Sequence, residues 1–151
     1  MKKTIFAILV LGAAIGAGSA WVMAGRAPGP ELQFLEPAAV GRIGQMVLSV
    51  ETPGAELNAL EVTLEQNGES FPVFSLGADG ASALVANGDR LTLVEPLGRE
   101  RFEALREGEA TLQARAVRPV LFGYREAESR ATHTFDVRLR PPIVNVQSSF
   151  H

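Results

Sequence analysis

The stretch "NALEVTLEQNGESFPVFSL" (residues 58–76) contains the clearest structural signal in this sequence. Apolar and polar residues alternate along its first half. The apolar set is Leu60, Val62 and Leu64, and the polar set is Glu61, Thr63 and Glu65. A period of two is that of a half-buried β-strand. Asn67-Gly68 supplies the positive φ angles that a tight hairpin turn needs, so the stretch predicts a β-hairpin over residues 60–76.

The same period recurs in four further segments, which we predict to be strands. They are "GQMVLSVET" (44–52), "DRLTLVE" (89–95), "EATLQARAV" (109–117) and "THTFDVRLR" (132–140), the last with Phe135, Val137 and Leu139 inward. Pro72 has no N–H group for a ladder and predicts an edge or a bulge for its strand. Only "GRERFEALREG" (98–108) is predicted to be helical, because Phe102 and Leu105 are spaced by three.

Six or seven short strands separated by turn signals predict an all-β fold, an immunoglobulin-like antiparallel β-sandwich preceded by one N-terminal hydrophobic helix. The disulfide and core Trp of antibody domains are absent, so the prediction rests on pattern alone. We divide the chain into a signal peptide or signal anchor (1–25), a linker (26–31), the sandwich (32–140) and the start of a following segment (141–151).

The N-terminus carries Lys2 and Lys3 and then no charge until Arg26. A run of this length is enough to span a bilayer, and Trp21 lies where an aromatic residue would meet the far interface. Small residues near its end also suit a signal peptidase, so retained anchor and cleaved signal both stay open. Either one predicts a body outside the cytoplasm, periplasmic and anchored to the inner membrane or secreted.

The composition excludes some classes of function. The chain has no Cys, which rules out disulfides and thiolate metal sites. After the two lysines, 12 arginines stand against 17 acidic residues, and this mildly acidic body argues against nucleic acid as a partner. In "RAVRPVLFGYRE" (115–126) we therefore interpret Phe122 and Tyr124 as packed beneath arginine side chains rather than as base-stacking residues.

We predict no catalytic, cofactor-binding or metal-ligating residue in this sequence. The two histidines are His133, which we predict to face solvent, and His151, and no spacing joins them into a zinc site. A strand would point His133 and Asp136 to opposite faces.

Two other patterns also have plain explanations. We interpret the carboxylate pairs Glu126/Glu128 and Glu107/Glu109 as solvated faces rather than acid/base pairs. "GADGASALVANGD" (77–89) lacks the residues of a phosphate or calcium loop and is predicted to be a plain surface loop.

Three stretches taken together resemble a known family. They are residues 24–68, "FPVFSL" (71–76) and "RPVLFGYREAESRATHTFDVRLRPPIVNVQSSFH" (118–151). They are similar to the N-terminal, non-catalytic region of bacterial envelope metallopeptidases of the lysostaphin-type M23 family, in a form associated with acidobacteria. The resemblance implies a zinc peptidase domain further along, acting on peptidoglycan through H-x(3)-D and H-x-H motifs. Neither motif is present here, since "HTFD" (133–136) has the wrong spacing.

Two functions follow as expectations. In the first, the chain is a non-catalytic accessory domain of such a peptidase, with zinc only in a downstream domain. "RPPIVNVQSSFH" (140–151) then closes the sandwich and begins the next segment, with a strand at residues 143–146 and a truncation at His151. In the second, it is a stand-alone, membrane-anchored immunoglobulin-like module that binds peptidoglycan or an envelope protein.

Overall fold

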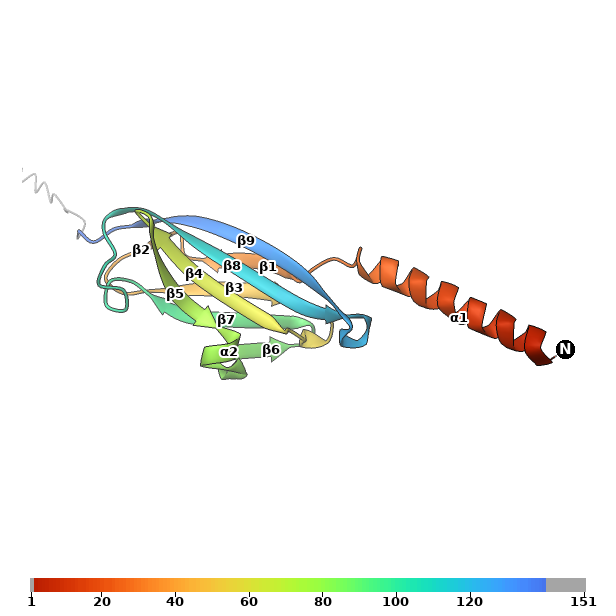
Figure 1. Ribbon diagram of the computed structural model, residues 1–151. Helices are drawn as coiled ribbons and strands as arrows, with labels where there is room; N and C mark the ends of the chain where they lie inside the picture. The colour runs from red at the N-terminus through yellow and green to blue at the C-terminus, as the bar shows by residue number, and fades with distance from the viewer. Residues whose placement is uncertain (1, 141–151) are drawn as a thin grey trace, which may run out of the picture.

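The computed structural model describes residues 2–140 and contains one long helix followed by two β-sheets (Figure 1). The helix is α1 (Lys2–Ala24). The first sheet has the order β1 (Glu31–Glu36), β3 (Gly44–Glu51), β7 (Arg90–Leu97) and β6 (Leu84–Asn87). The second sheet has the order β2 (Ala39–Val40), β9 (Arg125–Val137), β8 (Gly108–Val120), β4 (Ala59–Gln66) and β5 (Glu69–Ser75).

The core lies between the two sheets. Strands β3 and β7 contribute buried residues from the first sheet, and β4 and β8 contribute them from the second. Fully enclosed members include Met46, Leu48, Val50, Leu93, Leu60, Leu64 and Leu112. Two sheets sharing one apolar interior confirm the predicted two-layer, mostly β architecture.

The hairpin predicted for residues 60–76 is confirmed as β4 and β5. Asn67 and Gly68 form its turn with φ angles of 53° and 80°, and Gln66 pairs with Glu69 across it. The prediction for Pro72 also holds, because β5 is an edge strand and its register with β4 shifts between Val62 and Thr63.

The predicted helix at residues 98–108 is wrong, because this segment forms successive turns between β7 and β8. Gly98 has a φ of 123°, and a Cβ there would lie 2.6 Å from the Arg42 carbonyl oxygen. The next amides bond to the β2–β3 connection, as in Glu100 N to Arg42 O (3.0 Å). Tertiary hydrogen bonds thus replace those of a helix too short to be stable alone. Phe102 and Leu105 still face inward, as their spacing indicated.

The surface-loop prediction for residues 77–89 is only partly right. Two short helices, α2 (Leu76–Asp79) and η2 (Ala81–Ala83), occupy its first half. Its second half is the edge strand β6, which pairs with β7 through an Asn87-Gly88 turn. Asn87-Gly88 is the same hairpin signal as Asn67-Gly68, although the stretch that contains it was predicted to be a loop.

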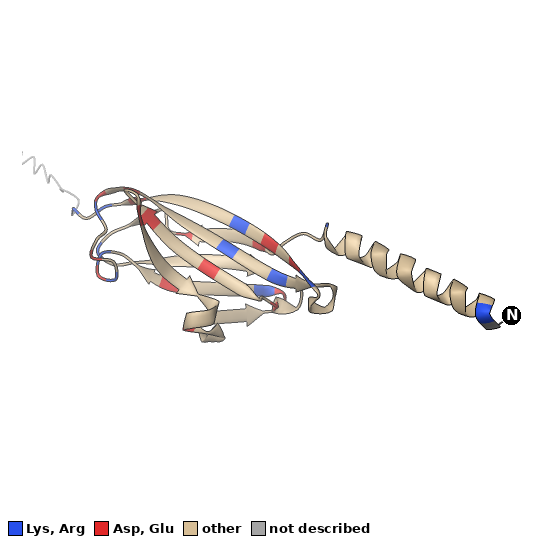
Figure 2. Ribbon diagram, in the orientation of Figure 1, with Lys and Arg blue, Asp and Glu red and all other residues tan. Residues whose placement is uncertain are grey.

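Helix α1 has the length and composition of a membrane span. At about 1.5 Å per residue its 23 residues extend roughly 34 Å, which exceeds the hydrocarbon core of a bilayer. Residues Lys3–Ala24 are apolar enough to cross a membrane, and none of the segment is buried against the sandwich. Figure 2 shows no charge along α1 beyond its N-terminal end. These properties fit a membrane anchor and a signal sequence equally.

Candidate functional site

His133 lies on the inner side of β9, so the prediction of a solvent-facing histidine is wrong. It has the same strand parity as the buried Phe135 and Val137. Its ring stacks on Phe34 of β1 with centroids 5.5 Å apart. Its Nε2 lies 2.5 Å from the Pro37 carbonyl oxygen, which only accepts, so Nε2 donates. His133 thus ties β9 of the second sheet to the end of β1 in the first.

Replacing His133 with alanine is expected to lower the free energy of unfolding by about 1–2 kcal/mol, because the half-buried Pro37 carbonyl loses its donor. Urea unfolding of the detergent-solubilised chain would measure this. The control is Thr132→Ala, an exposed neighbour on the same strand. Equal midpoints for the two variants would contradict a structural role for His133.

The described residues hold no group of three or more side chains able to bind a metal ion. Asp136 is exposed on the opposite face from His133 and pairs with Arg138 at 3.2 Å, as predicted. His151 and the predicted strand at residues 143–146 lie outside the described residues.

The carboxylate pairs are on the surface, as predicted. Glu126 accepts a 2.7 Å hydrogen bond from Asn58, and Glu107 pairs with Arg140 at 3.0 Å. Glu109 is exposed. None of these side chains lines an apolar cleft in the described part of the chain, so they show no acid/base arrangement.

Acidic residues of β4 and β9 lie on either side of arginine residues of β8 in the second sheet (Figure 2). Glu128 lies between Arg115 (2.8 Å) and Arg130 (2.7 Å). Hydrogen bonds from Arg115 and then Arg130 hold the pKa of Glu128 below its ordinary value. The same contact with Glu128 raises the pKa of Arg115. Both groups are open to solvent, which makes this a hydrated face rather than a reactive centre.

The junction between α1 and the sandwich is built by Trp21 and Arg125. The guanidinium of Arg125 lies 4.6 Å from the centre of the Trp21 ring, and its Nη1 donates to the Trp21 carbonyl at 2.7 Å. A cation at a helix C-terminus also interacts favourably with the helix dipole. These residues are 104 positions apart, and no sequence signal connected them.

The linker after α1 lies against the second sheet. Arg118 of β8 donates to the Pro28 carbonyl at 2.9 Å. Gly29 packs so closely on β9 that a Cβ would lie 2.2 Å from Ser129 Oγ, and Pro30 is buried. The start of β1 and the end of α1 are thereby fixed at one end of the sandwich (Figure 1).

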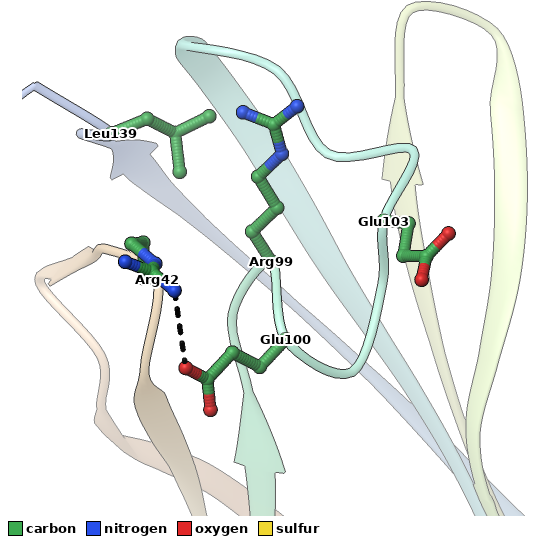
Figure 3. Close-up of a pocket in the computed structure, with 5 residues that line it drawn as sticks. All are labelled: Arg42, Arg99, Glu100, Glu103 and Leu139. Atoms are coloured by element: carbon green, nitrogen blue, oxygen red, sulfur yellow. Dashed lines mark ion pairs between the residues drawn. The ribbon is translucent and has the colours of Figure 1, made fainter.

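An open depression lies at the opposite end of the sandwich (Figure 3). Its lining residues are Arg42, Arg99, Glu100, Glu103 and Leu139. Arg42 and Glu100 are 3.8 Å apart and mostly exposed, so this pair contributes little to stability. The depression has charged groups of both signs around one apolar side chain, Leu139.

No protein-family profile matches this chain, and no curated protein matches it. Among solved structures, the chain is similar to MtrC from Shewanella baltica OS185, with 12% sequence identity and a TM-score of 0.38. The match covers 74% of this chain and 24% of that one, so this chain spans about a quarter of MtrC's length. The described residues define a two-sheet β domain that follows one apolar helix.

Proposed function

We propose that this chain is a membrane-anchored accessory domain of an M23-type cell-envelope zinc peptidase, itself non-catalytic, that holds the peptidase away from the inner membrane. The observation that carries the proposal is the separation of the two ends of the sandwich (Figure 1). Strand β9 begins at Arg125, beside Trp21, and runs 13 residues before the chain reaches Arg140. At about 3.3 Å per residue, β9 alone spans roughly 40 Å.

The orientation of the proposed anchor rests on charge. Lys2 and Lys3 precede the span, which favours a cytoplasmic N-terminus and a periplasmic sandwich. With α1 in the membrane, a segment that follows Arg140 would start far from the bilayer surface, toward the peptidoglycan. The resemblance of the sequence to the N-terminal region of M23 peptidases implies that such a segment leads to the zinc domain.

We also propose that the sandwich is immunoglobulin-like. What supports this is its strand order, β1-β3-β7-β6 facing β2-β9-β8-β4-β5. In that fold a sheet of four strands, A-B-E-D, faces a sheet built around G-F-C. If β1, β3, β7 and β6 are strands A, B, E and D, and β9, β8 and β4 are strands G, F and C, then both sheets have the strand order of the immunoglobulin fold.

Two experiments test the proposed function. The coding DNA beyond His151 should stay open and encode H-x(3)-D and H-x-H motifs, and a stop codon directly after His151 would refute the peptidase assignment. Deleting residues 31–140 from the longer protein should reduce cross-link cleavage in cells but leave chelator-sensitive activity on isolated peptidoglycan unchanged. Equal cleavage in cells would argue against a spacing role.

The depression in Figure 3 favours a second candidate, a stand-alone anchored module that binds an envelope protein or wall polymer. Its position at the end farthest from α1 leaves it accessible to such a partner. Pull-down from envelope extracts with the detergent-solubilised chain should enrich one partner, and Arg99→Glu should abolish the capture. The absence of any enriched protein or glycan would count against this function.

A further inference from the structure

The turn between β8 and β9 exposes large apolar side chains. This turn, which we name the β8–β9 turn, comprises Leu121–Gly123 (η3) and Tyr124. Phe122 is 99% exposed and Tyr124 is 78% exposed, so our interpretation that they pack beneath arginines is wrong. Neither ring gains stability from the sandwich core, and two large aromatic side chains this exposed are candidates for contact with a partner or a lipid surface.

The backbone of the turn has a conformation that is unfavourable for the residues it contains. Leu121 and Phe122 have φ angles of 51° and 56°, in the left-handed region that bulky side chains rarely adopt. Gly or Asn would relax a turn with these angles. The sequence instead keeps two large apolar residues there, and strain of this kind is concentrated at functional sites.

The β8–β9 turn lies beside the end of α1 (Figure 1). Ala24 and Ala27 line one depression together with Leu121, Phe122 and Gly123. Arg125, the first residue after the turn, holds Trp21 in the last turns of α1. If α1 spans a bilayer, these contacts bring the turn to the level at which the helix leaves the hydrocarbon.

The charges around the turn fit a lipid surface. The turn itself carries none, and Arg118 and Arg125 flank it on the two strands. Arg125 donates to the Trp21 carbonyl at the end of α1, and Arg118 donates to the Pro28 carbonyl in the linker. Two acidic residues lie nearby: Glu56 lines the same depression, and Glu126, next to Arg125, accepts a hydrogen bond from Asn58. Arginine and aromatic side chains together are typical of the membrane–water interface.

We propose that the β8–β9 turn is a second membrane contact, with Phe122 and Tyr124 inserted in the interface of the bilayer that α1 crosses. This rests on the proposed membrane anchoring and goes beyond it. Helix α1 and the contacts of Arg118 and Arg125 hold one end of the sandwich at the membrane. Insertion of the turn adds a second point of attachment, which restricts the tilt of the sandwich so that the end carrying Arg140 points away from the bilayer.

The test uses the full chain in phosphatidylcholine vesicles with brominated acyl chains, which quench nearby tryptophan. Trp21 is the sole tryptophan of the wild-type chain, and its quenching reports insertion of α1. In a Trp21→Phe background, Phe122→Trp should be quenched to a similar extent. The matched control is Ile43→Trp, 76% exposed at the far end of the sandwich, which should not be quenched.

The outcomes separate this proposal from the anchor itself. Quenching of Trp21 without quenching at position 122 overturns the membrane contact of the turn and leaves the anchor in place. The absence of quenching at both positions overturns both. Because Phe122 is almost fully exposed, its replacement by tryptophan should leave the circular dichroism spectrum unchanged, which checks that the variant folds.

Discussion

Replacing Leu105 with alanine is expected to lower the free energy of unfolding by about 2–5 kcal/mol. Leu105 is 0% exposed and belongs to the core between the sheets, although it lies in the irregular segment between β7 and β8. Removing its methyl groups leaves a cavity that the rigid sheets around it cannot close. Urea unfolding of the detergent-solubilised chain, followed by circular dichroism of the strands, measures the loss.

The matched control is Leu35→Ala on β1. Leu35 is 56% exposed, so the same change in chemistry should alter stability by about 0.5 kcal/mol or less. If Leu105→Ala unfolds at the same urea concentration as Leu35→Ala, the connection between β7 and β8 does not close the core.

Replacing Gln66 with leucine is expected to cost about 2–3 kcal/mol, even though the side-chain volume is nearly kept. Gln66 is 6% exposed at the end of β4. Its Oε1 accepts from the Arg106 amide at 2.8 Å, and its Nε2 donates to the carbonyls of Arg106 (2.9 Å) and Glu109 (3.3 Å). Leucine makes none of these bonds and leaves part-buried backbone groups without partners.

Gln113→Leu provides the comparison, because Gln113 is an exposed glutamine whose Nε2 donates to Glu65 at 2.7 Å. Water replaces that lost bond, so we expect about 0.5 kcal/mol or less. Hydrogen exchange of the Arg106 amide gives a second measurement. Its protection should fall in Gln66→Leu and stay unchanged in Gln113→Leu, and unchanged protection in both would refute the role of Gln66.

Local sequence predicted β3, β4, β5, β7, β8 and β9, because the evidence for these strands is local, but it did not predict β1, β2 or β6. Alternation at Leu60, Val62 and Leu64 requires only that one face be buried, and Asn67-Gly68 sets a turn through its own backbone preferences. The length and charge pattern of α1 are likewise readable without any tertiary contact. These features gave the mostly β class and the apolar helix.

Tertiary structure decided what depends on partners distant in the chain. The turns at residues 98–107 exist because Gly98 packs on the backbone of Arg42 and Gln66 binds Arg106. The junction of Trp21 with Arg125 joins residues separated by most of the sandwich. Exposure of Phe122 depends on where the two long strands β8 and β9 end. Sequence periodicity indicates which face of a strand is buried. The packing of the two sheets determines which strand ends and connections contact one another.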